Sequence, residues 1–273
     1  MAKGVRTEIA FFGVETARRL HAQGYAADLL AANNVLAHVP AIADFVSGIA
    51  HLLKPEGVTT LEFPHLLRLI EGVQFDTVYH EHYSYLSLLA VERIFATCGL
   101  RAFDVEELST HGGSLRVFAC LTGASHRETP RTAKTRADEA AAGLGESSGY
   151  AGLAPRVAKI KSRTLQFFAG MKASRKTVAA YGAAAKGNTF LNTCGLTAAD
   201  ILAVADLNPH KQGRLLPGSH IPIVAPDSLL ALHPDYTLIL PWNLKAELIA
   251  QLSAMQSWRG RFVIAIPELE VIA

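Results

Sequence analysis

Residues 177–195, TVAAYGAAAKGNTFLNTCG, decide the fold class of this chain. A short apolar run is followed by a turn of small residues and then by a segment with helical spacing, which is the order of a strand, a turn and a helix. Further apolar runs alternate with amphipathic segments, so this part of the chain predicts a parallel sheet with helices on both faces. The runs lie within residues 199–209, 220–234, 236–252 and 261–267.

The N-terminal region shows the same alternation of strand and helix patterns. Its last two strands are separated only by the turn THGG, which leaves no room for a crossover helix, so we expect an antiparallel hairpin. A glycine-rich strand-to-helix turn with an acidic residue about 20 positions later is absent from this region. The predicted elements are a helix over 7–24, a strand from 27 into a loop ending at 40, a helix over 41–54, a strand over 58–64, a helix over 90–99, and strands over 100–109 and 114–122.

These patterns predict an α/β protein in three parts. Residues 1–124 form a partial Rossmann-like domain, residues 125–175 a helical connector rich in Ala, Arg, Lys, Glu and Ser, and residues 176–273 a second Rossmann-like domain with a parallel sheet.

Composition narrows the partners and the location. Lys and Arg number 26 against 24 Asp and Glu, and no basic run alternates with aromatic residues, so a small anionic metabolite is a better partner than nucleic acid. Cys98, Cys120 and Cys194 form no C-x-x-C pair and are expected to be core residues in a reducing compartment. No apolar run is long enough to span a membrane and no export signal precedes the first helix, so we expect a cytoplasmic protein.

The stretch FDTVYHEHYSYLS, residues 75–87, concentrates titratable side chains. In an extended segment His80 and His82 would share one face, with Tyr79, Glu81 and Tyr83 on the other, whereas a loop would remove that division. A His-x-His pair can bind zinc, but no third and fourth ligands stand nearby, so removal of a proton from a carbon acid is favoured over metal binding. A half-buried strand with satisfied polar groups remains the alternative.

The stretch AANNVLAHVP, residues 31–40, is a second candidate. Asn33 and Asn34 are expected at the carboxyl end of a parallel strand, where open α/β sheets bind ligands, and His38 follows in the loop. This loop and the histidine-rich stretch can therefore face one crevice. Simple turn chemistry is the alternative for the two asparagines.

The C-terminal domain carries a third group of candidates. Lys186 opens a helix whose free amides favour an anion such as a phosphate, although the segment is neither a P-loop nor a G-x-G-x-x-G motif. Trp242 can stack on a base or sugar, while Arg214 and Lys245 can meet phosphate. Solvated loop charges are the alternative for each. Asp206, Asn208, Lys211 and Asn243 are expected at the same edge of the sheet.

The chain as a whole resembles the S-adenosylmethionine-dependent C-methyltransferases that act on nucleotide-linked deoxysugars. The resemblance rests on motifs that occur in order, namely FFG, ANNVLAHVP, LLKPEGV, YHEHYSYLS, HGGSLRVF, AAAKGNT, DLNPHKQGRLLPG, HIPI and PWNLK. Members of that family typically have a zinc domain, a cofactor domain and a C-terminal Rossmann-like domain, with the sugar nucleotide held between the last two. Residues 1–273 match only the later half of the cofactor domain and the complete C-terminal domain. The chain is therefore expected to be a fragment, a truncated gene product or one part of a split protein, in which an upstream polypeptide supplies the missing half of the cofactor domain.

The resemblance implies the chemistry and the roles of the residues. A base removes the proton next to a ketone, and the carbanion takes the methyl group of S-adenosylmethionine, so no metal is needed. His82 is the implied base, Glu81 orients it or contacts the sugar, Tyr79 positions the substrate, and His38 moves protons or holds the substrate. Asn33 and Asn34 match the loop that faces the cofactor. The implied sugar-nucleotide residues are Ser114, Lys186, Arg214, Trp242, Asn243 and Lys245.

Two other functions are compatible with the sequence. The chain can be a sugar-nucleotide-binding remnant without catalytic activity, because part of the cofactor domain is missing. It can also be a nicotinamide-dependent oxidoreductase that uses Asp206, although the missing G-x-G-x-x-G motif counts against this function.

Overall fold

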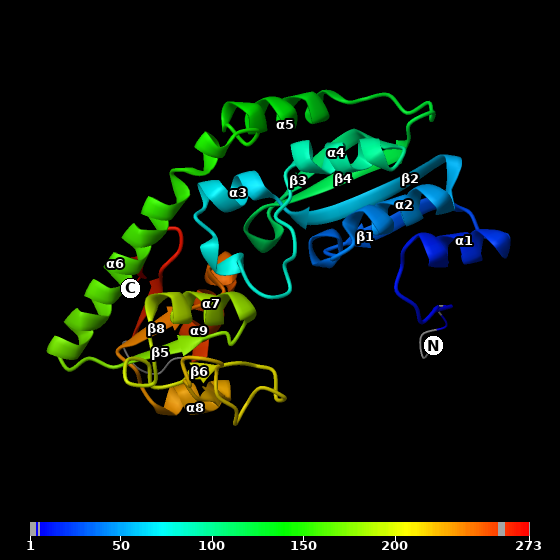
Figure 1. Cartoon of the computed structure of the whole chain (residues 1–273). Helices are drawn as coiled ribbons and strands as arrows, with labels where there is room; N and C mark the ends of the chain where they lie inside the picture. The colour runs from blue at the N-terminus through cyan, green and yellow to red at the C-terminus, as the bar shows by residue number, and fades with distance from the viewer. Residues whose placement is uncertain (1–3, 5, 256–259, 273) are drawn as a thin grey trace. The chain divides into compact units, whose positions relative to one another are not determined.

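The computed structural model describes residues 4, 6–255 and 260–272, and its chain divides into two compact units. The first unit comprises Met1–Arg68 and Glu81–Tyr150, and the second comprises Leu69–His80 and Ala151–Ala273 (Figure 1). The second unit thus includes a short segment from the N-terminal half of the chain, which no pattern in the sequence indicates. The domain boundaries after residues 124 and 175 remain a prediction.

The first unit is built on a four-stranded sheet of order β1-β2-β4-β3. β1 and β2 are parallel, and β4 is antiparallel to both β2 and β3, which confirms the predicted hairpin. The elements are α1 (Val14–Ala22), β1 (Ala27–Asn33), η1 (Leu36–His38), α2 (Ile42–Leu52), β2 (Leu53–Pro64), α3 (Leu66–Glu71, which continues into the second unit), α4 (Leu88–Thr97), β3 (Leu100–Leu108), η3 (Thr110–Gly112), β4 (Ser114–Leu121), α5 (Pro130–Ala141) and η4 (Ser147–Tyr150), where η denotes a 3-10 helix.

The predicted helix over residues 7–24 is wrong for its first half, because α1 begins only at Val14. The side chains of Ile9 and Phe11 are fully exposed, so the helical spacing of apolar residues there meets no core that would stabilise a helix. Gly13 is extended, and the Val14 amide donates to Asp44 Oδ1 at 3.3 Å. Asp44 thereby satisfies a free amide at the start of α1.

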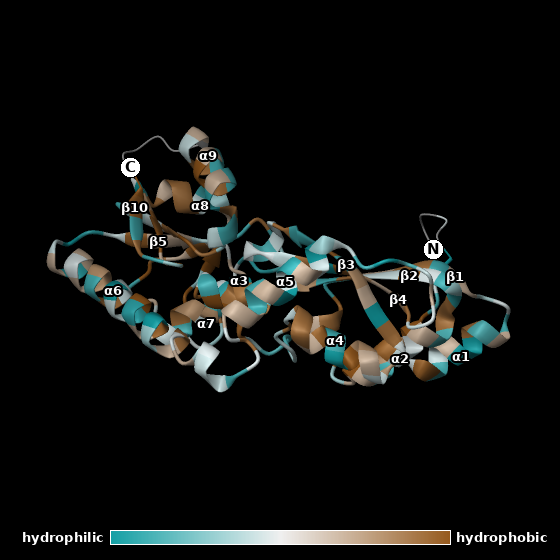
Figure 2. Cartoon of the chain, turned by 90° about the horizontal axis from the view of Figure 1, so that it is seen from above, coloured by the Kyte–Doolittle hydropathy of each residue, from teal (hydrophilic) through white to brown (hydrophobic). Residues whose placement is uncertain are grey.

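Side chains alternate across the first sheet, as a period of two requires. Leu61 and Phe63 of β2 are fully buried in a core that α2 and α4 complete, and Figure 2 shows α1, α2 and α4 along the same side of this sheet. Between them, Glu62 pairs with Arg116 of β4, which also pairs with Glu106 of β3. Burial of the apolar face therefore sets the register, and the opposite face carries a row of cross-strand ion pairs.

The second unit contains a six-stranded sheet of order β10-β9-β8-β5-β6-β7. All neighbouring strands are parallel except β10, which is antiparallel to β9 and was not predicted. The elements are η2 (Phe75–Thr77), α6 (Leu153–Ala173), β5 (Val178–Tyr181), α7 (Ala185–Cys194), β6 (Val204–Ala205), β7 (Ile223–Val224), α8 (Pro226–Ala231), β8 (Tyr236–Ile239), η5 (Trp242–Leu244), α9 (Lys245–Met255), β9 (Arg261–Ile264) and β10 (Glu270–Ile272).

Both faces of this sheet are covered, as the sequence predicts for parallel strands. On β5, Val178 and Ala180 join a core formed with α6 and α7, whereas Ala179 and Tyr181 join a second core formed with α8 and α9. The α/β architecture with a parallel C-terminal sheet is therefore confirmed.

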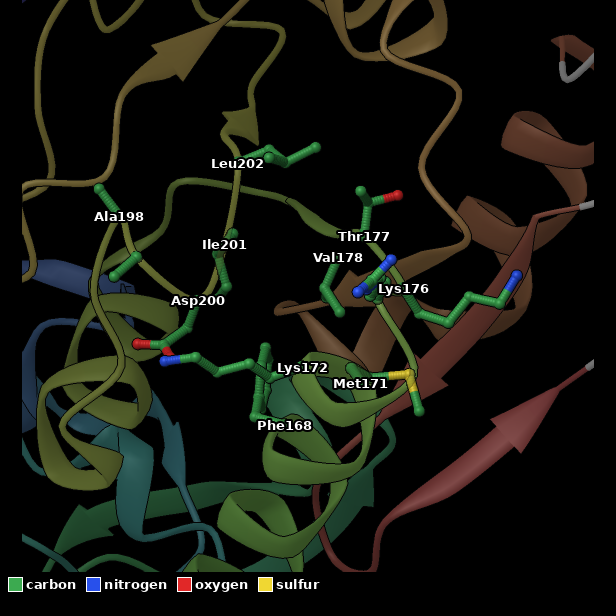
Figure 3. Close-up of a pocket in the computed structure, with 12 residues that line it drawn as sticks. Phe168, Met171, Lys172, Lys176, Thr177, Val178, Ala198, Asp200, Ile201 and Leu202 are labelled. Carbon is green, nitrogen blue, oxygen red and sulfur yellow. The ribbon is translucent and has the colours of Figure 1, made fainter.

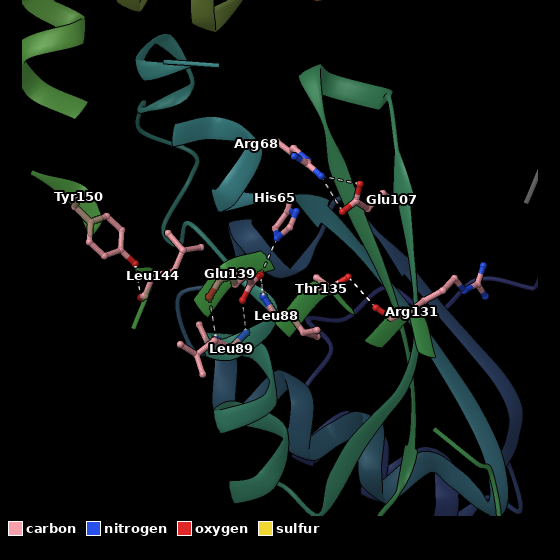
Figure 4. A network of polar contacts seen from close by, with 12 residues as sticks. His65, Arg68, Leu88, Leu89, Glu107, Arg131, Thr135, Glu139, Leu144 and Tyr150 are labelled. Atoms are coloured by element: carbon pink, nitrogen blue, oxygen red, sulfur yellow. Dashed lines mark hydrogen bonds and ion pairs between the residues drawn. The ribbon is translucent and has the colours of Figure 1, made fainter. Parts of the chain in front are cut away.

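Glu139 of α5 organises the middle of the first unit (Figure 4). Its carboxylate accepts hydrogen bonds from the amides of Leu88 at 2.6 Å and Leu89 at 2.9 Å, which are free amides at the start of α4. It also lies 2.7 Å from Nε2 of His65, the residue that follows β2. Both side chains are about 1% exposed, so this contact is fully removed from water. One carboxylate thus joins α5, the start of α4 and the end of β2.

Glu139→Ala should lower the free energy of unfolding by about 2–4 kcal/mol, because two helix amides and a buried imidazole would lose their partner. Urea denaturation of the purified chain measures this loss. Glu139→Gln, which keeps one acceptor oxygen, should cost less. The exposed Glu146 is the control, since Glu146→Ala should change stability by no more than about 0.5 kcal/mol. Equal stabilities for the Glu139 and Glu146 variants would contradict the role of Glu139.

Candidate functional site

The histidine-rich stretch is not a strand. Residues 79–81 form a bend and turn, and the chain then continues in an irregular segment up to Leu86, which bridges to His65. The division of its side chains between two faces of a strand therefore does not apply. The boundary between the two units falls within the stretch, so that Tyr79 and His80 count with the second unit and Glu81 and His82 with the first.

Within the first unit, the stretch lies against the loop that follows β1. The carbonyl of Ala37 accepts hydrogen bonds from the amides of Tyr83 at 2.9 Å and Ser84 at 3.2 Å. Nδ1 of His38 lies 2.9 Å from the carbonyl oxygen of Glu81. The structure therefore brings together two segments that are more than 40 residues apart and that the sequence places in one crevice.

His82 is the centre of a group of rings. Its imidazole lies 4.8 Å from that of His38 and 6.1 Å from the ring of Tyr85, both in edge-on orientations. His38, His82 and Tyr85 are half-buried, so each side chain is packed in the unit and keeps some surface accessible to solvent. The Glu81 side chain is exposed. This group contains two imidazoles in contact and a carboxylate beside them, which is suited to proton transfer.

Asn33 and Asn34 lie where they were expected, at the carboxyl end of β1. Asn33 pairs with Glu62 of the parallel strand β2, and the Asn34 amide donates to the Glu62 carbonyl at 2.8 Å. Asn34 has a φ of 54°, a left-handed conformation that asparagine tolerates better than most residues. Both residues are exposed and available to a ligand.

Ser114 is the candidate least available to a ligand. Its side chain is 1% exposed, and its hydroxyl donates to the Thr110 carbonyl at 3.1 Å within the turn between β3 and β4. In this conformation the hydroxyl stabilises the turn.

In the second unit, three predicted residues meet at the carboxyl edge of the sheet. Nζ of Lys186, near the start of α7, donates to Oδ1 of Asn243 at 2.9 Å and lies 4.7 Å from the ring centroid of Trp242. Glycines let these elements approach closely. A Cβ on Gly182, whose φ is 92°, would lie 2.5 Å from the Pro241 ring, and one on Gly187 would lie 2.8 Å from Leu240.

The same group contains a residue that the sequence does not single out, Asp76 of η2. Its side chain is fully buried, and its Oδ2 accepts a hydrogen bond from Nε1 of Trp242 at 2.7 Å. Asp76 and Trp242 are 166 positions apart in the chain. An aspartate between Phe75 and Thr77 looks like ordinary turn chemistry in the sequence, so only the fold shows this contact.

Burial shifts the pKa values of Asp76 and Lys186. The pKa of Asp76 is raised from 3.8 to about 6, chiefly because burial disfavours the charged carboxylate, and the Trp242 hydrogen bond and the charge of Lys186 oppose the shift. The pKa of Lys186 is lowered, again chiefly by burial, and the charge of Asp76 opposes this. Buried charges with shifted pKa values are typical of functional sites.

The remaining predicted residues of the second unit do not join this group. Arg214 is exposed, and Lys245 forms an exposed ion pair with Glu270 at 3.3 Å. Asp206 accepts hydrogen bonds from the amides of Ala183 and Asn208, both at 2.8 Å, so it ties the turn after β5 to the loop after β6. Because both its oxygens hold the backbone, Asp206 offers no support for the nicotinamide-dependent alternative.

Two cavities among the described residues of the second unit do not offer a ligand site at this edge. A cavity of about 280 Å³ lies at the amino ends of β5 and β6, between Met171, Lys172 and Ile201 (Figure 3). Parallel sheets bind ligands at the opposite, carboxyl edge. The cavity between Asp76 and Trp242 measures only about 10 Å³.

Across residues 4, 6–255 and 260–272, no three His, Cys, Asp or Glu side chains gather in a way that could hold a metal ion. None of the helices in that part of the chain has the length and apolar character needed to cross a membrane.

Comparison with known proteins identifies the family. The sequence model described as "C-methyltransferase C-terminal domain" matches residues 109–267, more than half of the chain, so the chain belongs to the C-methyltransferase family. The resemblance found in the sequence is thereby confirmed at this level. The chain is 37% identical over 271 residues to the C-methyltransferase NovU of Streptomyces niveus, and the match covers 99% of this chain and 64% of that relative. It therefore spans just under two thirds of the length of NovU.

Solved structures show weaker likeness. Magnesium protoporphyrin IX methyltransferase of Synechocystis PCC 6803, a structure with bound SAH, is 17% identical with a TM-score of 0.29 and covers 36% of this chain and 47% of that chain. An O-methyltransferase family protein of Burkholderia thailandensis is 20% identical with a TM-score of 0.29 and covers 42% of this chain and 33% of that chain. Such low scores support no inference about this chain.

Asp76→Asn should make the protein more stable at high pH relative to wild type. The raised pKa means that the folded state binds a proton more tightly than the unfolded state between about pH 4 and pH 6. The contribution of protonated Asp76 to the free energy of unfolding is therefore fully present below pH 4 and is lost as the pH rises through 6. The stability of the Asn variant minus that of wild type should increase by about 1.5 kcal/mol between pH 5 and pH 8.

Chemical denaturation at both pH values measures this difference. Asp227→Asn is the control, since Asp227 is an exposed carboxylate of the same unit. A difference between Asp76→Asn and wild type that stays constant with pH would show that the pKa of Asp76 is not raised.

Proposed function

We propose that this chain carries the proton-abstracting and substrate-binding parts of an enzyme that methylates carbon. The methyl group comes from S-adenosylmethionine and goes to the carbon next to the ketone of a nucleotide-linked keto-deoxysugar. Family membership and the likeness to the C-methyltransferase NovU support the reaction class. The contact between His38 and His82 is the observation that carries the proposal, because carbon methylation of a ketone needs a base.

The hydrogen bond of His38 supports a proton-transfer role. A carbonyl oxygen can only accept, so Nδ1 of His38, 2.9 Å from the Glu81 carbonyl, carries the hydrogen. In the neutral ring Nε2 is then the acceptor. His38 thus provides a second proton acceptor beside His82, whose ring is 4.8 Å away.

In the proposed reaction His82 removes the proton next to the ketone, and the negative charge moves to the ketone oxygen. His38 can take the proton onward through its free Nε2, because its other nitrogen is held by the backbone. Glu81 orients the sugar or the base, and Tyr79 positions the substrate. Bound S-adenosylmethionine would supply the electrophilic methyl group.

Two features support the proposed ligand sites. Asn33 and Asn34 fit the edge of a cofactor site, because both are exposed at the carboxyl end of parallel strands. Lys186, Trp242 and Asn243 fit a diphosphate and an attached base, because an ammonium group, an aromatic ring and an amide meet near the start of α7. Arg214, Lys245 and Ser114 are retained as weaker candidates for the sugar nucleotide.

The proposal includes a polypeptide outside residues 1–273 that completes the cofactor site, and a cytoplasmic location. The exposure of β1 supports the proposal that a further polypeptide completes the cofactor site. In the described part of the chain β1 pairs only with β2, and its Leu29 is 64% exposed. Parallel strands are normally buried on both sides by further elements.

His82→Ala should slow proton removal about 10²–10⁴-fold, which is the usual contribution of a general base. Exchange of the substrate's α-proton for deuterium, followed by NMR, measures this step without the methyl donor. The matched control is His80→Ala, since His80 is the exposed neighbouring histidine and should exchange at the wild-type rate. A wild-type rate in His82→Ala would mean that another group is the base.

Calorimetry separates the enzyme from a non-catalytic binding remnant. S-adenosylmethionine and a pyrimidine diphosphosugar are titrated separately into the chain. Binding of the sugar nucleotide together with proton exchange supports the proposed function, whereas sugar-nucleotide binding without exchange supports the remnant. Binding of neither would contradict both.

A further inference from the structure

Asp76 is the most unusual charged residue in the described part of the second unit. Its side chain has no exposed surface, Oδ2 accepts a hydrogen bond from Nε1 of Trp242, and Oδ1 has no hydrogen-bond partner among the described residues. A buried carboxylate with one free oxygen is costly, because no hydrogen bond replaces the water that the free oxygen loses on burial. A neutral residue of the same size would stabilise the unit better, so stability does not explain this aspartate.

The contacts of Asp76 point instead to Trp242 and Lys186. The hydrogen bond to Nε1 restricts rotation of the indole, whose ring lies 4.7 Å from Nζ of Lys186. Trp242 is half-buried and extends from η5 at the carboxyl edge of the sheet. The orientation of the ring at this edge is therefore set by a residue from η2.

Asp76 also acts on the charge of Lys186. Burial lowers the pKa of the Lys186 ammonium, and the charge of Asp76 raises it. In the described part of the chain the ammonium contacts the Trp242 ring and the Asn243 amide, and neither of them titrates. From α6, which also packs on α7, Lys161 acts on Cys194 at the far end of that helix. Asp76 thus helps to keep Lys186 protonated.

We infer that Asp76 is a positioning residue for the diphosphate and base of a nucleotide ligand, because it fixes the Trp242 ring and sustains the positive charge of Lys186. The inference rests on the proposed function, since it assumes that a nucleotide sugar binds at this edge. Asp76 itself has no exposed surface, so it acts without touching the ligand. Its loss should therefore weaken nucleotide binding and leave the rate of proton removal at saturating substrate unchanged.

Three variants separate the effect of Asp76 on the Trp242 ring from its effect on the charge of Lys186. Asp76→Ala removes the acceptor and should weaken binding of uridine or thymidine diphosphate, measured by calorimetry, at least tenfold. Asp76→Asn keeps an acceptor for Nε1 and should bind within about threefold of wild type near pH 6.5. Asp76→Asn lacks the carboxylate charge that helps to keep Lys186 protonated. As the pH is raised, this variant should therefore lose nucleotide affinity at a lower pH than wild type does. Asp227→Ala should bind as wild type does.

A double-mutant cycle tests the path through the indole. Trp242→Phe keeps a ring but has no Nε1 donor, so adding Asp76→Ala to it should cost less affinity than Asp76→Ala costs alone. Fully additive losses would overturn the positioning role. Circular dichroism confirms folding of each variant, and Asp76→Asn keeps the test valid if Asp76→Ala does not fold.

Fluorescence provides a readout that does not depend on activity or ligand. The chain has two tryptophans, Trp242 and Trp258, so Trp258→Phe leaves Trp242 as the single indole. Its emission should titrate near pH 6, and Asp76→Asn should abolish this transition. Wild-type nucleotide affinity in Asp76→Ala overturns the inference even if proton exchange supports the proposed function. If the wild-type chain does not exchange the substrate's α-proton, but Asp76→Ala still weakens nucleotide binding, the proposed function is contradicted and the inference about Asp76 is supported.

Discussion

The buried carboxylate of Glu139 is the contact on which the arrangement of the first unit depends. It accepts hydrogen bonds from two amides at the start of α4 and contacts His65 after β2. The histidine-rich stretch ends at that helix, and the first residues of its later segment, 81–87, are held by the Ala37 carbonyl and by His38. The segment that carries His82 is therefore fixed at both ends without being part of a helix or strand. Such fixed irregular segments suit proton transfer, because the rings keep one geometry while some of their surface stays accessible to solvent.

Glu139 and Asp76, two of the buried acids among the described residues, illustrate opposite uses of a carboxylate. Both oxygens of Glu139 are hydrogen-bonded by groups that would otherwise lack partners, so its burial stabilises the fold. Asp76 has one free oxygen and a pKa raised to about 6, so its charge at neutral pH costs stability. Residues of the second kind are typical of sites selected for binding or catalysis, where stability is given up for function.

Much of the fold was predictable because the apolar patterns are strong. The parallel sheet of the second unit follows from short apolar runs between amphipathic helices, and the β3–β4 hairpin follows from the short turn between two strands. The helix expected from Thr7 failed because Ile9 and Phe11 have helical spacing but meet no core. The β10 strand was not predicted, because three residues next to a loop carry too little pattern to identify an edge strand.

The candidate site also has features that the sequence predicts and features that only the fold shows. The sequence by itself determined the chemistry available, namely the imidazoles of His38 and His82, the amides after β1 and the Lys186 ammonium, since residue types and strand ends can be read from local pattern. Only the tertiary structure decided which of these groups meet. It bonded the Ser114 hydroxyl to the turn before β4, brought residues 69–80 into the second unit and set Asp76 against Trp242. Contacts between residues so far apart in the chain depend on long-range packing and burial, and local sequence pattern carries no record of either.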